Sequence, residues 1–104
     1  MKQKNIYLVV YDISDNKKRN RVAKLLQQFG YERIQLSVFT GNIKPAKFEL
    51  LWKKLEKAAD ADNFPDNKLF CFAVTENAIR QMQKIGTFTL DVDYILGNKK
   101  TIIF

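Results

Sequence analysis

The first apolar run of the chain leads directly into a carboxylate, and it constrains the fold more than any other segment. Residues Ile6 to Val10 are all apolar or aromatic, and Tyr11 and Asp12 follow them. Such a run predicts a central β-strand that is buried on both faces. An isolated buried carboxylate is too costly to keep charged, so we expect Asp12 where the strand surfaces, solvated, paired or bound to a cation. Asp12 is therefore the first candidate for chemistry.

Composition sets the class of protein. A chain of 104 residues with 46% hydrophobic and 28% charged residues suits one folded domain, residues 1–104. No apolar run approaches the roughly 20 residues of a membrane span, and the basic start lacks a signal-peptide core, so we expect a cytoplasmic protein without a membrane partner. The single cysteine, Cys71, excludes an internal disulfide, and histidine is absent. Acids, bases and metal ligands must then come from carboxylates, Tyr, Lys or water.

The net charge of +7 is concentrated in the first half of the chain. Residues 1–52 contain ten Lys and Arg against four Asp and Glu, whereas residues 53–104 contain eight against seven. An asymmetric basic surface favours phosphate-rich partners such as nucleic acid, with solubility alone as the alternative.

Periodicity predicts the elements in the first half. Helical spacing from about 16 to 29 ends at Gly30, with Ser14 or Asp15 as the candidate N-cap. Alternation from Ile34 to Val38 predicts a strand, followed by a bend and a second strand towards Ile43.

The second half continues the pattern. Pro45 begins a helix, and the spacing of its apolar residues is again helical. A dense apolar strand runs from Leu69 to Val74, and Thr75 caps a short helix that extends to Gly86. Two last strands are expected, at residues 88–96 and 101–104.

The order strand, helix, strand, strand, helix, strand predicts an α+β, ferredoxin-like βαββαβ domain with an antiparallel sheet. Two helices can cover only one face of this sheet, so we expect a homodimer that covers the open face or edge. The C-terminal strands, at about residues 87–104, extend beyond the basic fold and could pair with the partner's sheet.

An ordered set of short segments resembles the CRISPR-associated protein 2 family. The segments are Tyr11-Asp12-Ile13, Lys18-Arg19-Asn20-Arg21, Phe29-Gly30 and the run from Arg33 to Phe39. They cover the first half of the chain closely. Thr40 departs from the pattern, because many members have a glutamate there; a second carboxylate is therefore not expected at this position.

The resemblance implies a homodimer that takes part in spacer acquisition with the CRISPR integrase, CRISPR-associated protein 1. It also implies an endonuclease, dependent on Mg²⁺ or Mn²⁺, that hydrolyses phosphodiesters in RNA or DNA. In some members the carboxylate is dispensable, and the protein is a noncatalytic scaffold for duplex DNA. A ribonuclease toxin of the virulence-associated protein D type, which shares the fold, is a weaker alternative.

For catalysis, Asp12 is the expected metal ligand. One carboxylate is a poor Mg²⁺ site, but a two-fold axis near the strand's end would bring two copies of Asp12 together around a metal that activates water. The alternative is that Asp12 caps a turn or the helix start. Tyr11 and Ser37 are further candidate catalytic residues, Ser37 as a group that orients the site. Phe39 is a candidate for substrate or dimer contact, and core packing is its equal alternative.

For nucleic-acid binding, Lys17, Arg21 and Lys24 recur at helical spacing opposite the apolar stripe and form a cationic ridge. Lys18, Arg19 and Arg33 are its basic neighbours, and the resemblance also implies a role for Arg19, Arg21 and Arg33 near the site. The alternative is a solvated helix face. Phosphate contacts do not read sequence or a 2′-hydroxyl, so single-stranded RNA and duplex DNA both stay open.

Overall fold

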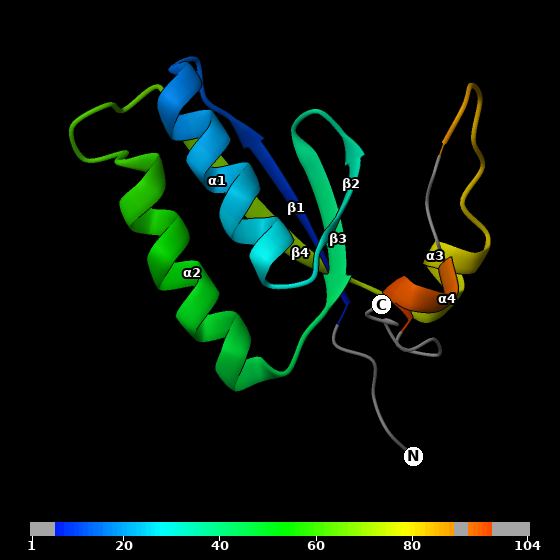
Figure 1. Cartoon of the computed structure of the whole chain (residues 1–104). Helices are drawn as coiled ribbons and strands as arrows, with labels where there is room; N and C mark the ends of the chain where they lie inside the picture. The colour runs from blue at the N-terminus through cyan, green and yellow to red at the C-terminus, as the bar shows by residue number, and fades with distance from the viewer. Residues whose placement is uncertain (1–5, 89–91, 97–104) are drawn as a thin grey trace, which may run out of the picture.

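The chain forms one four-stranded antiparallel sheet with two long helices packed on one of its faces (Figure 1). The computed structural model describes residues 6–88 and 92–96. The elements are β1 (Ile6–Asp12), α1 (Asn16–Gln28), β2 (Glu32–Gln35), β3 (Val38–Asn42), α2 (Pro45–Ala59), β4 (Lys68–Val74), α3 (Glu76–Arg80) and α4 (Val92–Ile95).

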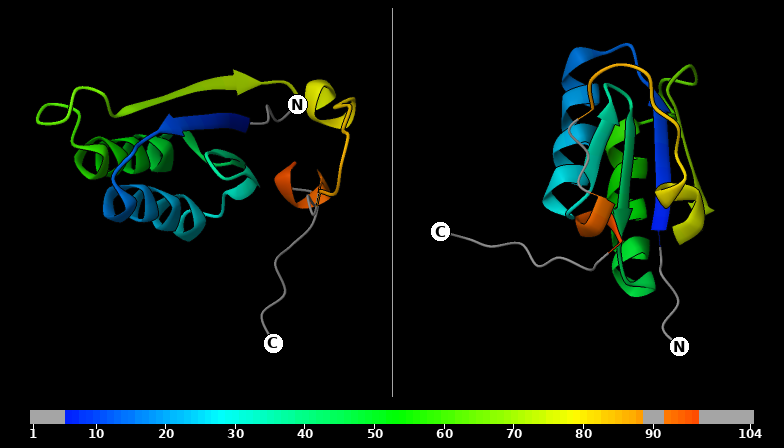
Figure 2. Two further views of the ribbon diagram at one scale, coloured as in Figure 1. Left: turned by 90° about the horizontal axis from the view of Figure 1, so that it is seen from above. Right: turned by 90° about the vertical axis from the view of Figure 1, so that its right-hand side faces the viewer.

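The strand order β2-β3-β1-β4 places β1 in the middle of the sheet. It pairs antiparallel with β3 and with β4, and β2 pairs antiparallel with β3. This topology confirms the predicted α+β, ferredoxin-like βαββαβ fold. The two helices run antiparallel to each other on the same side of the sheet, as the view from above shows (Figure 2).

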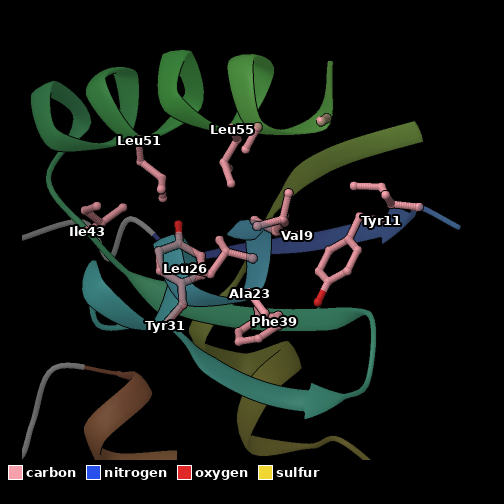
Figure 3. Packing of buried hydrophobic residues seen from close by; sticks show 13 residues of the cluster. Val9, Tyr11, Ala23, Leu26, Tyr31, Phe39, Ile43, Leu51 and Leu55 are labelled. Atoms are coloured by element: carbon pink, nitrogen blue, oxygen red, sulfur yellow. The ribbon is translucent and has the colours of Figure 1, made fainter. Parts of the chain in front are cut away.

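The main core lies between the helices and the sheet. Val9 and Tyr11 of β1 and Phe39 of β3 face Leu26 of α1 and Leu51 of α2, and all five are buried (Figure 3). Side chains alternate between the two faces of a strand, so the odd-numbered residues of β1 face the helices.

The opposite sheet face is only partly covered within one chain. Leu8 and Val10 are half-buried, and their cross-strand neighbours Phe72 and Phe70 are 48% and 53% exposed. The prediction that β1 is buried on both faces is therefore wrong for a single chain. We call Leu8, Val10, Phe70 and Phe72 the open face.

Capping of the helices follows the sequence closely. The Asp15 carboxylate accepts a hydrogen bond from the Lys18 backbone N–H at 2.8 Å, which makes Asp15 the N-cap of α1. Thr75 caps α3 through a bond from the Ala78 N–H. Both N-caps confirm the predicted starts of these helices. The Asp15 cap also fixes the position of the chain just after Asp12.

The predicted pair of strands with a bend between them is present, but the bend lies earlier than expected, because Leu36 and Ser37 form the turn of a β-hairpin. The Ser37 carbonyl accepts a hydrogen bond from the Tyr11 N–H at 3.0 Å. This contact with β1 holds the turn, and a register shift between Arg33 and Gln35 precedes it.

The C-terminal predictions need correction as well. Helix α3 ends at Arg80 instead of reaching Gly86, and Ile85 is 98% exposed, so no apolar face continues to hold the helix. Residues 92–95 form the helix α4 rather than part of a strand, because Ile95 and Leu96 are both buried in a small cluster with Ile6 and Ile79. The predicted strand at 101–104 lies outside the described residues.

Candidate functional site

Asp12 lies at the end of β1 and is exposed. Its cross-strand neighbour is Lys68, in the same register that pairs Val10 with Phe70, so Asp12 shares the open face. Its carboxylate forms no ion pair or side-chain hydrogen bond with any described residue. A solvated carboxylate at this position is free to bind a cation or a second molecule.

Tyr11, in contrast, points to the helix side of the sheet. Its hydroxyl donates a hydrogen bond to the Leu36 carbonyl at 2.9 Å, and its ring stacks on Phe39 with centroids 6.1 Å apart. Burial raises the pKa of Tyr11, and the nearby charges of Arg33 and Arg19 offset this only in part. A buried phenol with this bond holds the hairpin turn against β1 and is poorly placed for proton transfer at Asp12.

Ser37 and Phe39 occupy structural positions. Ser37 is half-buried in the turn, where its backbone carbonyl makes the contact with Tyr11. Phe39 is fully buried in the core, and the Arg33 guanidinium lies over its ring at 5.1 Å from the centroid. For Phe39, this burial favours core packing over contact with a substrate.

Two of the predicted basic residues are held by the protein itself. Arg19 donates hydrogen bonds to the carbonyls of Ile13 at 3.1 Å and Ser14 at 3.4 Å, and to the Asn16 side chain. It thereby closes the loop between β1 and α1.

Lys18 reaches to the other helix instead. Its ammonium lies 3.9 Å from the Asp60 carboxylate and 4.5 Å from the centroid of the Phe64 ring. It ties α1 to the loop that follows α2, so neither Lys18 nor Arg19 is a free cation.

The ridge residues Lys17, Arg21 and Lys24 are all exposed on α1, opposite the buried Val22 and Leu26. Arg33 is also exposed. The structure therefore places four of the six predicted basic residues where phosphates could reach them.

The capacity for metal binding within one chain is small. Among residues 6–88 and 92–96, no three acidic or cysteine side chains gather closely enough to hold a metal ion. Thr40, which supplies no second carboxylate, is buried. Asp12 alone fits a divalent cation poorly, because Mg²⁺ prefers octahedral oxygen coordination.

Sequence reasoning missed the exposed lysines of α2. Their signal was present in the helical spacing of the segment 45–59. The exposed cations are Lys47, Lys53, Lys54 and Lys57.

The fold and the exposed Asp12 define a small α+β protein with a candidate cation-binding carboxylate at the end of its central strand. Residues 5–82 match the family described as CRISPR associated protein Cas2. The chain belongs to this Cas2 family.

Two curated relatives illustrate the match. The chain is 41% identical over 85 residues to the CRISPR-associated endoribonuclease Cas2 2 of Pyrobaculum aerophilum, which covers 78% of this chain and 87% of that protein. It is 48% identical over 52 residues to the CRISPR-associated endoribonuclease Cas2 1 of Archaeoglobus fulgidus, and that alignment spans only 50% of this chain and 55% of the relative.

Solved structures agree with the family. Streptococcus pyogenes Cas2 superimposes with a TM-score of 0.68 at 27% identity, over 78% of this chain and 99% of that one. A chain of a partial Cas6-RT-Cas1–Cas2 complex gives a TM-score of 0.66 at 26% identity, over 78% of this chain and 90% of that one. No helix among the described residues is both long and apolar enough to cross a membrane.

Proposed function

We propose that this chain is a cytoplasmic CRISPR adaptation protein that acts as a homodimer with the CRISPR integrase, CRISPR-associated protein 1. The relatives named endoribonuclease and the neighbour from a Cas1–Cas2 complex support this role. We further propose that the dimer hydrolyses phosphodiesters of RNA or DNA with the help of Mg²⁺ or Mn²⁺. The exposed Asp12 at the end of the open face, which forms no ion pair with any described residue, is the observation that carries this activity.

Cation binding requires the dimer, because one chain supplies too few carboxylate ligands for a divalent cation. Stacking the open faces of two chains would bury Phe70 and Phe72 and bring the same edge of each sheet together. A two-fold axis near the end of β1 would then place two copies of Asp12 around one cation, whose charge relieves their repulsion. A cation held there would polarise the phosphate and activate water for attack.

The roles of the other predicted residues follow from their contacts. Tyr11 and Ser37 position the hairpin turn beside β1 and support Asp12 indirectly. Arg33 lies over the ring of Phe39, on the helix side of the sheet, so it is not the cation nearest to Asp12. Lys68, exposed and directly opposite Asp12 across β1 and β4, is the described cation that could hold a phosphate beside this carboxylate.

The alternative function is a noncatalytic scaffold that holds duplex DNA for the integrase. The exposed ridge of Lys17, Arg21 and Lys24 favours it, since phosphate contacts need no metal. The lack of a cluster of three acids among the described residues favours it too.

Two variants separate the functions. Asp12→Asn removes the ligand charge at nearly constant volume, and Asp66→Asn, at an exposed loop carboxylate, is the matched control. We expect Asp12→Asn, and not Asp66→Asn, to abolish Mg²⁺-stimulated cleavage while the dimer persists. Mixed dimers with one altered subunit should also be impaired, whereas half of wild-type activity would argue for independent sites.

Measuring spacer integration in cells distinguishes a metal-dependent nuclease from a noncatalytic scaffold. The second variant changes Lys17, Arg21 and Lys24 to Gln. Loss of integration only in this variant selects the scaffold, and loss in both variants supports a metal-dependent role. Cleavage that survives Asp12→Asn in a nuclease-free preparation would remove Asp12 from the mechanism.

A further inference from the structure

We propose that the outer surface of the two long helices is a binding face for duplex nucleic acid, to which both α1 and α2 contribute. We call Lys17, Arg21 and Lys24 of α1 with Lys47 and Lys54 of α2 the two-helix face. The inference rests on the proposed nucleic-acid-binding function and assigns it a surface that includes residues no motif identified.

The α1 side of this face is purely cationic. Lys17, Arg21 and Lys24 are exposed, and helix α1 contains no acidic residue. A phosphate approaching α1 from outside therefore meets no carboxylate of that helix.

On α2, basic and acidic side chains lie on different sides of the helix. Lys47, Leu50 and Lys54 follow each other at i, i+3 and i+7 and share one side of the helix. Lys47 and Leu50 line a hollow of about 400 Å³ together with three residues at the end of α1, so this side faces α1. The three residues are Gln28, Phe29 and Gly30.

The acids of α2 lie away from α1. Glu49 and Glu56 are seven residues apart and share the other side of the helix. Glu56 lines a second groove, with Trp52 and Leu69, between α2 and β4. The seam between the antiparallel helices thus combines cations from both helices and excludes both acids of α2.

The dimensions suit a nucleic-acid backbone. A helix of 15 residues such as α2 is about 22 Å long at 1.5 Å per residue. This length spans about six steps of a duplex at 3.4 Å per step. Within each helix the cations of the face span seven residues, or about 10 Å, which corresponds to about three such steps.

The face offers little aromatic surface to single strands. Base stacking requires exposed aromatic rings, and the exposed ones among the described residues, Phe64, Phe70 and Phe72, lie in a loop and on β4. Phe29 lines the hollow beside Lys47 and Leu50 but is half-buried. Contacts by charge therefore predominate, which favours a duplex bound without regard to sequence.

The two-helix face lies on the opposite side of the sheet from the open face (Figure 2). A dimer formed through the open faces would leave both two-helix faces uncovered and directed away from each other. Such a dimer would hold two duplex segments at once.

A charge inserted into the seam tests the proposal. Leu50 is 51% exposed between Lys47 and Lys54, and Leu50→Glu and Leu50→Gln lose the same packing but differ by one charge. We expect Leu50→Glu to bind an unrelated DNA duplex about tenfold more weakly than Leu50→Gln at low salt, because the carboxylate repels nearby phosphates. Fluorescence anisotropy measures binding, and circular dichroism confirms that both variants fold.

Salt dependence gives the second readout. The double change of Lys47 and Lys54 to Gln should reduce the log–log salt slope by about 1.8, or about 0.9 for each lost contact. The control, Arg80 and Lys84 to Gln, removes the same charge from exposed positions outside both the two-helix face and the open face and should leave the slope unchanged.

The outcomes separate this inference from the proposed function. Equal binding by the two Leu50 variants, or an unchanged slope in the α2 variant, would overturn the two-helix face. If the α1 ridge variant alone lost binding, nucleic-acid binding would stand without α2. Equal losses in the Arg80 and Lys84 control would place the duplex elsewhere. Binding of phosphatidylserine vesicles without duplex binding would assign the face to a membrane surface.

Discussion

Removing the two exposed rings of β4 should dissociate the proposed dimer while each chain stays folded. Phe70 and Phe72 stack with centroids 6.5 Å apart and are 53% and 48% exposed. Complete burial of a Phe side chain contributes about 1.5–3 kcal/mol, so covering the exposed half of each ring contributes about 1 kcal/mol. A symmetric dimer contains four such rings. Changing both residues to Thr should therefore cost about 4 kcal/mol, or about a thousandfold in the dimer dissociation constant.

Sedimentation equilibrium over a dilution series measures this constant. Thr is β-branched and, like Phe, favours strands, so the far-UV circular dichroism of the variant should match the wild type. Ile85→Thr is the control, because Ile85 is 98% exposed but lies outside the sheet. A dissociation constant unchanged by the double substitution, or a wild-type chain that stays monomeric at every concentration, would refute pairing through the open face.

Further predictions concern folding stability, measured by urea denaturation. Tyr11→Phe should lower the free energy of unfolding by about 1 kcal/mol, because it removes the hydrogen bond to the Leu36 carbonyl. Tyr31→Phe should leave this free energy unchanged or raise it, because the buried Tyr31 hydroxyl has no hydrogen-bond partner among the described residues. Burial raises the pKa of both phenols above the ordinary 10.0, so their neutral forms are favoured in the fold. The free energy of unfolding should therefore fall as the pH rises above about 10, and it should fall less steeply in Tyr31→Phe. Gly41→Ala should lower the free energy of unfolding by about 1–3 kcal/mol, because the added Cβ would lie 2.7 Å from Cδ1 of the Tyr31 ring. A negligible decrease would mean that the ring shifts freely.

The order of elements was predictable because the local patterns of this chain are distinct. The apolar spacing of α1 and α2 is helical, and Asp15 and Pro45 mark where these helices begin. Strand β1 is a continuous apolar run that ends at Asp12. These signals are local, so the sequence alone predicts the topology and the surface position of Asp12.

The errors arose where contacts distant in sequence decide the structure. Leu36 and Ser37 continue the apolar–polar alternation of a strand, yet the bonds from Tyr11 make them a turn. The apolar positions near residue 95 suit a strand or a helix, and packing of Ile95 on Ile6 selects the helix. Periodicity cannot distinguish these outcomes, since the deciding partner is far along the chain.

The same limit applies to the basic residues of the candidate site. Lys18 and Arg19 have the same charge and nearly the same position as Lys17 and Arg21. Lys18 is engaged by Asp60, which is 42 residues away, while Arg19 is engaged by carbonyls of its own loop. Charge spacing identified the helix but could not identify which cations were free.

Alternation along β1 also separates the two proposed activities within one chain. Asp12 shares the open face with Leu8 and Val10, so a cation there requires the second chain that covers this face. The two-helix face lies on the other side of the sheet and is complete in a single chain. Duplex binding by one chain therefore needs no dimer, whereas hydrolysis at Asp12 does, and dilution below the dimer dissociation constant should abolish cleavage before it abolishes binding.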